Sequence, residues 1–245
     1  KCHTDPYRVF FMLYTNKVNK ILLMPKTTLF TEKLRENDMY MTRAQLNKEY
    51  GYLPVSVTKV ILTSKNKREQ TKLKELLRDP NSEMAKATAK GRNVHKAFET
   101  GIIEDDYTQK VLDVFKKDIL NDIDEVWAQE KSVIHDNHKY CGKFDGVGIY
   151  KGKLTLFDYK KTNKPKLTNS SMRNYLLQLC AYKKAHDSMY EDYRIEQIAL
   201  FNMYGKNIND IASNVKILTP DEIDDNTSRF YGHLLDYSMG NKTLV

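Results

Sequence analysis

The chain has 245 residues, of which 40% are hydrophobic and 29% are charged, a balance typical of globular proteins. This length fits one large domain, or a core with added elements. No apolar run reaches about 18 residues, so we expect no membrane span. The net charge of +8 favours a polyanionic partner. Nucleic acid is expected before a membrane surface, because no basic amphipathic helix carries an apolar face rich in Trp or Leu.

The cysteines indicate a reducing environment. The three of them, Cys2, Cys141 and Cys180, are scattered and have no C-x-x-C spacing. Neither a disulfide framework nor a zinc site is therefore predicted, and we expect an intracellular location. Phage or bacterial cytoplasm and mitochondrial matrix are not distinguished. Because the chain begins at Lys1 and not at Met, we expect a trimmed chain that could have lost a targeting segment.

The first half of the chain predicts an accessory region followed by helices. Residues 7–30 have the pattern of two strands joined by a polar turn, and the polar segment 31–53 favours a short helix. We expect residues 1–51 to form an N-terminal β-hairpin or accessory region and 52–245 to form the main domain. Residues 52–61 indicate a loop that enters a short strand or helix. Further helices are predicted at 64–78, 82–101 and 104–120.

The second half predicts a sheet and its covering helices. Three antiparallel strands are expected at 125–135, 140–150 and 153–161, with further strands at 193–204 and 214–218. Helices are expected at 170–186 and from 219 to 239, the latter opened by Thr219 as N-cap and Pro220. This order predicts an α/β (α+β) fold and not a Rossmann or barrel repeat.

Two aspartates are predicted to face each other across a hairpin. Gly152 favours a two-residue turn between strands 140–150 and 153–161. If the strands pair outward from this turn, Asp145 lies directly opposite Asp158. The two Cβ atoms would be roughly 5 Å apart on one face, where like charges destabilise the pair. A divalent cation removes this penalty, and hard oxygen ligands suit Mg²⁺ or Mn²⁺.

Lys160 adds a third chemical group to this pair. It follows Asp158 by two residues, so both side chains point to the same face of the strand. A lysine beside a metal and a phosphate can position or deprotonate the attacking water and offset charge in the transition state. An isolated Asp-x-Lys is more often an exposed salt bridge. The register that brings Asp145 opposite Asp158 favours an active site for phosphodiester hydrolysis.

These residues resemble a known nuclease superfamily. The segments G-K-F-D-G-V (142–147) and F-D-Y-K-K-T (157–162) resemble the PD-(D/E)XK nucleases, and within them the RecB-like exonuclease branch. G-R-N-V-H (91–95) resembles the helix that supplies the histidine of that branch. L-P-V-S-V-T (53–58) resembles a Y-P-S-V-T segment of mitochondrial genome maintenance exonucleases and related phage exonucleases, with one inserted residue, Val55. The resemblance covers about residues 52–240.

The resemblance implies a PD-(D/E)XK restriction-endonuclease-like core, with a central mixed β-sheet flanked by helices. It also implies roles for individual residues. The expected metal ligands for Mg²⁺ or Mn²⁺ are His95, Asp145, Asp158 and the backbone carbonyl of Tyr159. Lys160 would act on the water, Glu130 on the first core strand would support the metal or its hydration shell, and Gln178 and Tyr182 would hold Lys160 or the scissile phosphate.

Structural alternatives remain open for several of these residues. His95 could be a packing residue beside an apolar stripe, and Glu130 could pair with a lysine. Gln178 and Tyr182 could belong to a polar helix face and a core rim. Some relatives carry an iron–sulfur cluster on four cysteines, which three scattered cysteines cannot build, so we expect a cluster-free protein.

Basic residues flank the expected site and predict contacts to nucleic acid. Positive side chains lower the cost of holding phosphates and make binding depend on salt. The segment 160–166 continues directly from the catalytic strand, whereas the basic helix 64–78 could equally be a solvated face. The expected nucleic-acid contacts are Ser56, Arg92, Lys161, Lys164, Lys166 and Arg173.

The sequence therefore predicts a Mg²⁺- or Mn²⁺-dependent deoxyribonuclease, an exonuclease that serves DNA replication, repair or recombination. The preference for single-stranded DNA ends comes from the resemblance. An endonuclease of the same superfamily is one alternative, and a non-catalytic nucleic-acid-binding subunit is another. A decayed site would have lost one of Asp145, Asp158, Lys160 or His95, yet all are present. Polarity of cleavage, choice of DNA or RNA, and oligomeric state stay open.

Overall fold

The computed structural model describes residues 39–52, 54–65, 67–165 and 169–242. The strands expected within residues 7–30 lie outside this part of the chain. Of the accessory region, the structure describes a short segment and helix α2 (Arg43–Tyr50), which agrees with the short helix expected within 31–53. The boundary between an accessory region and a main domain at residue 52 stays a prediction.

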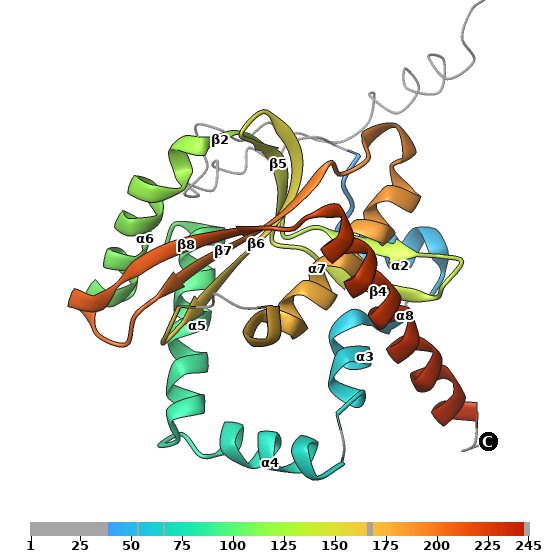
Figure 1. The fold of residues 1–245 in the computed structure, drawn as a ribbon, viewed down its shortest axis with the longest axis horizontal. Helices are drawn as coiled ribbons and strands as arrows, with labels where there is room; N and C mark the ends of the chain where they lie inside the picture. The colour runs from blue at the N-terminus through green and yellow to red at the C-terminus, as the bar shows by residue number, and fades with distance from the viewer. Residues whose placement is uncertain (1–38, 53, 66, 166–168, 243–245) are drawn as a thin grey trace, which may run out of the picture.

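A five-stranded mixed sheet forms the centre of the fold (Figure 1). In spatial order its strands are β2 (Ile123–Gln129), β5 (Gly146–Tyr150), β6 (Lys153–Thr162), β7 (Gln197–Tyr204) and β8 (Ala212–Ile217). Strands β6 and β7 run parallel, whereas all other neighbours run antiparallel. The predicted central mixed sheet is confirmed.

Helices cover both faces of this sheet. One layer contains α5 (Glu83–Thr100) and α6 (Asp106–Asp118), and the other contains α3 (Val57–Thr63), α7 (Asn169–Met189) and α8 (Pro220–Lys242). Strand β6 alternates between the two layers: Leu156 packs in the core with α7, and Phe157 packs in the core with α5 and α6. The α/β fold class is therefore confirmed, and the arrangement is consistent with the core expected from the resemblance.

The helices form close to where they were expected. The predictions at 82–101, 104–120, 170–186 and 219–239 are confirmed within a few residues. Thr219 and Glu222 form a capping box at the start of α8, with each side chain accepting from the backbone N–H of the other residue. Short 3-10 turns connect the remaining elements at η1 (Leu120–Asp122), η2 (Glu191–Tyr193) and η3 (Ile208–Asp210). None of the described helices has the length and apolar content needed to cross a membrane.

The basic helix α4 (Lys67–Arg78) begins later than the expected residue 64 and has no buried residues. In Figure 1 it connects α3 to α5 at a distance from the sheet. Its Leu73 and Leu76 side chains are half-buried, and the helix contacts α5.

Two of the expected strands are wrong as continuous elements. The strand predicted at 125–135 is divided into β2 and β3 (Ser132–His135), and the strand predicted at 140–150 is divided into β4 (Tyr140–Lys143) and β5. Strands β3 and β4 pair in a second sheet of order β1-β4-β3, in which β1 (Val55–Ser56) is the third member. At each break the chain passes from one sheet to the other, so each of the two predicted long strands contributes residues to both sheets.

The hairpin of β5 and β6 has the register that the sequence predicted. Tyr150 pairs with Lys153, and Gly146 pairs with Phe157. Lys151 and Gly152 both have positive φ, 52° and 72°, as a type I′ turn requires. Any residue other than glycine at position 146 would clash with the ring of Phe157, because its Cβ would lie 2.1 Å from that ring.

A buried histidine in α7 should make the stability of the fold depend on pH. His186 is fully buried, and a hydrogen bond of 3.1 Å joins its Nε2 to the hydroxyl of Tyr40. Burial lowers the pKa of His186 below 6.5, although the Asp187 carboxylate acts in the opposite direction. His186 is therefore neutral in the folded chain, whereas the unfolded chain takes up a proton below its ordinary pKa. The stabilisation is complete above pH 6.5 and is lost as the pH falls toward the folded pKa.

We predict that the free energy of unfolding falls as the pH drops below about 6.5, with His186 contributing up to about 1.4 kcal/mol per pH unit. His186→Gln should show a weaker fall, because glutamine does not titrate. Urea denaturation of both proteins at several pH values measures this difference. Equal pH dependence in the two proteins would show that His186 is not the group that takes up the proton.

Candidate active site

The two chain breaks lie side by side and place acidic side chains together. Glu130 follows the end of β2, and Asp145 stands in the bend between β4 and β5. The N–H of Glu130 donates to the carbonyl of Asp145 at 3.2 Å, and the N–H of Phe144 donates to the carbonyl of Lys131 at 3.0 Å. Glu130 has a positive φ of 53°. The expectation that Glu130 lies within a core strand is therefore wrong: it stands at a left-handed bend that ends the strand.

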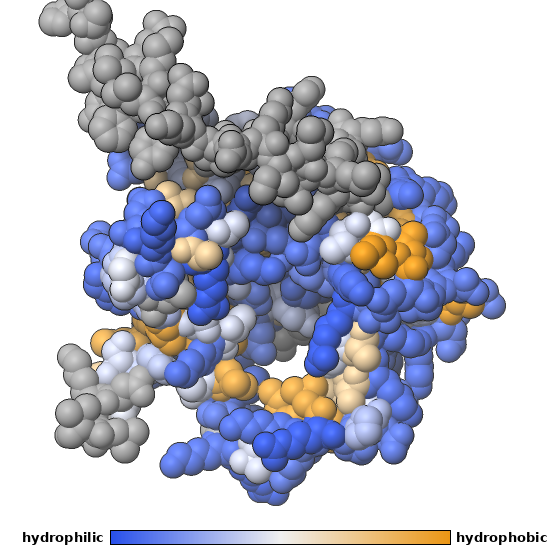
Figure 2. All heavy atoms as spheres, turned by 180° about the vertical axis from the view of Figure 1, so that it is seen from behind, coloured by the Kyte–Doolittle hydropathy of each residue, from blue (hydrophilic) through white to orange (hydrophobic). Residues whose placement is uncertain are grey.

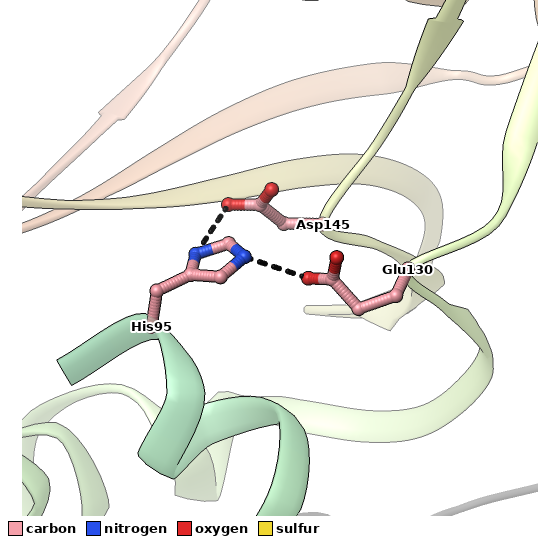
Figure 3. Close-up of side chains that lie close together, drawn as sticks. All are labelled: His95, Glu130 and Asp145. Atoms are coloured by element: carbon pink, nitrogen blue, oxygen red, sulfur yellow. Dashed lines mark ion pairs between the residues drawn. The ribbon is translucent and has the colours of Figure 1, made fainter. Parts of the chain in front are cut away.

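His95 joins these two acids from the neighbouring helix α5 (Figure 3). Its Nε2 lies 2.9 Å from Oε1 of Glu130, and its Nδ1 lies 3.7 Å from Oδ2 of Asp145. One ligand atom from each of the three side chains falls within 4.8 Å of the others. The His95 side chain keeps 32% of its exposure, so this cluster of His95, Glu130 and Asp145 is open to solvent on one side.

The charges in this cluster stabilise one another. The hydrogen bond to Glu130 and the Asp145 carboxylate raise the pKa of His95, although burial opposes them. Burial acts to raise the pKa of Glu130, but the hydrogen bonds from His95 and Lys143 outweigh it and lower that pKa. Lys143, two residues before Asp145, contacts the second carboxylate oxygen of Glu130. Glu130 is therefore ionised between the His95 ring and the Lys143 ammonium group.

Asp158 and Lys160 lie beside the cluster on β6. Lys160 Nζ is 2.5 Å from Oδ2 of Asp158 and 3.8 Å from Oδ2 of Asp145. Asp158 is 2% exposed, and burial followed by the nearby Asp145 raises its pKa, against the effect of Lys160. Burial acts to lower the pKa of Lys160, but the two aspartates outweigh it and raise that pKa. The structure thus brings together Asp145, Asp158 and Lys160, as the hairpin register predicted.

The donor set fits a divalent cation, on two observations. The cluster of His95, Glu130 and Asp145 offers one nitrogen and two carboxylate oxygens within 4.8 Å of one another. Oδ1 of Asp158 is buried and has no hydrogen-bond donor in the described part of the chain. Carboxylate oxygens are the ligands that Mg²⁺ and Mn²⁺ prefer. Asp158 itself lies outside the three-residue cluster, since its carboxylate pairs with Lys160.

The backbone of Tyr159 also reaches the site. Its N–H donates to Oδ2 of Asp145 at 3.1 Å, and this bond fixes the orientation of the carboxylate. The ring of Tyr159 packs 5.5 Å from the ring of His95, centroid to centroid. The part of Tyr159 seen to contact the acid is therefore the amide, and the carbonyl named as a metal ligand stays a prediction.

Gln178 and Tyr182 lie behind the site on α7. Nε2 of Gln178 donates to the hydroxyl of Tyr182 at 2.9 Å, the contact expected of residues four apart on a helix. Tyr182 packs against Gly142, where a Cβ would lie 2.0 Å from a ring carbon. Burial raises the pKa of Tyr182, and the nearby Asp158 adds to this effect. Tyr182 therefore lies near the aspartates and Lys160, and Gln178 contacts Tyr182, while the roles of both residues stay predictions.

A pocket of about 330 Å³ opens between α2, α3, β4 and α7. Of the residues singled out in the sequence, Ser56, Gln178 and Tyr182 line it. The other lining residues are Arg43, Leu46, Thr58, Ser132, Cys141, Gly142 and Lys143. Lys143 links the pocket to the cluster, because it also contacts Glu130. The sequence analysis did not identify Arg43, because only the fold brings this residue near α7. It did not single out Lys143 either, although this residue belongs to the G-K-F-D motif.

The other expected nucleic-acid contacts lie at or near the surface. Arg92, Lys164 and Arg173 are exposed, and Lys161 is half-buried. Lys166 lies outside the described residues. The described cysteines Cys141 and Cys180 are buried free thiols.

Comparison with known proteins gives a partial sequence similarity. No family model matches the chain. A stretch of 74 residues, 29% of this chain, is 40% identical to mitochondrial genome maintenance exonuclease 1 of mouse and of human. The aligned part spans 22% of the length of these relatives. A crystal structure of LHK-Exo in complex with dAMP aligns with 78% of this chain and 91% of its own, at 11% identity and a low TM-score of 0.33.

We predict that Mn²⁺ binds to the wild-type protein and raises its midpoint of thermal unfolding. His95→Ala and Glu130→Gln should each weaken this binding by at least about tenfold, because each removes a donor from the cluster. Isothermal titration with Mn²⁺ measures the affinities. Glu104→Gln is the matched control, since Glu104 is exposed and pairs with Lys96 away from the cluster. Equal affinities in all four proteins would show that the cluster does not hold the ion.

Proposed function

We propose that this protein is a metal-dependent DNA exonuclease that hydrolyses phosphodiester bonds. The observation that carries the proposal is the convergence of Asp145, Asp158 and Lys160 beside His95 and Glu130. The partial similarity to proteins named exonucleases supports the same reaction class. The proposal includes action on single-stranded ends and a role in DNA replication, repair or recombination. These two points are supported by that similarity and by the sequence motifs.

In this proposal the cation is held by His95, Glu130 and Asp145, and Asp158 is the adjacent carboxylate. Bound Mg²⁺ or Mn²⁺ supplies a Lewis acid that activates water and neutralises charge on the phosphate. The N–H of Tyr159 keeps the Asp145 carboxylate in place. His95 donates toward Glu130 from Nε2 only while that nitrogen carries a proton, so metal binding through Nε2 requires its loss.

Lys160 acts as a fixed positive charge in this site. Its pKa is raised by the two aspartates, so its ammonium group is charged at neutral pH. A charged donor that is already in position stabilises the negative charge that develops on a phosphodiester under attack. It can also hold a water molecule by hydrogen bonding. We therefore assign Lys160 to charge stabilisation and water positioning, and not to proton abstraction.

The strand is proposed to approach along basic and hydroxyl side chains around the site. The pocket beside α7 would accept a nucleotide next to the scissile phosphate, with Arg43, Ser56 and Lys143 as polar contacts. Arg92, Lys164 and Arg173 would contact phosphates farther away. The face drawn in Figure 2 is predominantly hydrophilic and is hollowed near its centre.

We predict that Asp158→Asn and Lys160→Ala each reduce Mg²⁺-dependent digestion of end-labelled single-stranded DNA by at least about a thousandfold. Binding of the same DNA, measured by fluorescence anisotropy in EDTA, should change by less than about tenfold. The exposed pair Asp136 and Lys139 supplies matched controls, so Asp136→Asn and Lys139→Ala should digest DNA like the wild type. Wild-type protein that digests no DNA with either Mg²⁺ or Mn²⁺ would refute the proposal.

A circular single-stranded substrate separates the alternatives. An exonuclease leaves the circle intact and digests the linear form, whereas an endonuclease of the same superfamily cuts both. A non-catalytic subunit binds both and digests neither.

The pocket gives a prediction of its own. Arg43→Gln should raise KM for single-stranded DNA by about tenfold, with a smaller change in kcat, because the missing cation contacts the strand and not the reacting atoms. Arg229→Gln is the control, as Arg229 is exposed and pairs with Asp225 on α8. Steady-state digestion over a range of DNA concentrations gives both constants. A fall in kcat with unchanged KM would place Arg43 outside strand binding.

A further inference from the structure

Two lysines from different elements share the ring of Tyr107. Lys90 of α5 places its Nζ 4.4 Å from the ring centroid, and Lys161 of β6 places its Nζ 5.1 Å from the same centroid. Tyr107 belongs to α6, and its hydroxyl donates to the carbonyl of Gly205 at 2.7 Å. The ring is thereby fixed as a platform beneath two ammonium groups that the helices and the strand bring together.

Neither ammonium group has a carboxylate within ion-pair distance in the part of the chain that the structure describes. Lys161 donates to the side-chain oxygen of Asn163 at 2.8 Å, and Lys90 donates to the carbonyl of Lys206 at 3.3 Å. The neighbouring acids are engaged elsewhere. Glu83 pairs with Lys206 at 3.0 Å, and Asp105 caps α6 by accepting from the N–H of Thr108.

This arrangement leaves positive charge without full compensation. Lys161 is half-buried, and its ammonium group lies over the same ring as that of Lys90. The negative face of the Tyr107 ring offsets part of the repulsion. An anion that contacts both ammonium groups would remove the rest, because each group has three N–H donors and uses one of them in a described hydrogen bond.

The position of Lys161 on β6 indicates the chemical class of this anion. Lys161 follows Lys160 directly, so its side chain points to the opposite face of the same strand. A nucleic-acid strand with one phosphate at Lys160 would reach Lys161 by passing from one face of β6 to the other near the end of the strand. A phosphodiester carries the charge and the two free oxygens that two ammonium groups can share.

We propose that Lys90, Lys161 and Tyr107 form a clamp for a backbone phosphate of the substrate strand, separate from the scissile phosphate. The proposal rests on the proposed function, which supplies the strand. The clamp would position the strand without reading its sequence, since phosphate contacts carry no base information. Its contribution would depend on salt concentration.

The test is a double-mutant cycle on DNA binding. Affinity for fluorescent oligothymidylate is measured by anisotropy in EDTA, where no hydrolysis occurs, at several salt concentrations. Lys90→Gln and Lys161→Gln should each weaken binding by about tenfold. The double variant should weaken binding by much less than the product of the two effects, because the lysines hold one phosphate. The slope of log affinity against log salt should become shallower by about 0.7 for each phosphate that the variant no longer neutralises.

Two sets of variants control this experiment. Lys116→Gln removes an exposed charge from the same helix as Tyr107, and its effect should simply multiply with that of Lys161→Gln. Tyr107→Phe keeps the ring but loses the hydrogen bond that fixes it, so it should weaken binding less than Tyr107→Leu, which removes the ring. Thermal unfolding of each variant shows whether the fold is retained.

The outcomes distinguish this proposal from the proposed function. If Lys90→Gln and Lys161→Gln bind DNA no more weakly than Lys116→Gln, or if their effects multiply, the clamp is refuted even when the wild type digests DNA. If the wild type digests no DNA but the cycle shows the expected coupling, the clamp stands and the nuclease proposal fails. An equal weakening of binding to polyglutamate would show a general anion site and would overturn the assignment to phosphate.

Discussion

The compensation of three crowded carboxylates is the constraint on which this site depends. The side chains of Glu130, Asp145 and Asp158 keep 9%, 8% and 2% of their exposure, and burial of unpaired charge is expensive. The groups that compensate them are the His95 ring and the ammonium groups of Lys143 and Lys160, which come from α5, β4 and β6. The positions of three elements are therefore coupled through one electrostatic balance. A metal ion would enter this balance as a further cation, in competition with the protein's own.

Much of this arrangement could be predicted from the sequence, because short-range rules determine it. A two-residue turn with Gly152 fixes the hairpin register, and a period of two assigns the faces, so the meeting of Asp145 and Asp158 follows from local information. The helices could be predicted equally well, because apolar spacing and caps such as Thr219 are local signals. His95 was different: spacing alone indicated a packing residue, and only the resemblance suggested a role in the site.

The remaining features depend on contacts that no local pattern shows. The breaks at Glu130 and Phe144 are held by backbone hydrogen bonds between segments that are neighbours in space but separated in the sequence. A glutamate at positive φ also has no sequence signal like that of glycine. Continuous strands were therefore the natural prediction. The pocket draws Arg43, Ser56 and Gln178 from three separate segments, so its lining emerges only when the chain is folded. The pairing of Lys90 with Lys161 over one ring is hidden for the same reason.

Strand β6 has a consequence for how this protein can tolerate insertions and deletions. Its successive side chains enter two unlike environments, an acidic site on one face and an aromatic core around Phe157 and Tyr159 on the other. Deletion of a single residue from the strand would not merely displace Asp158 and Lys160 along its axis. It would exchange the two faces, sending charged groups into the aromatic core and rings into the acidic site. Such a shift of register in β6 would therefore prevent folding, and it would not yield a folded protein with an altered site.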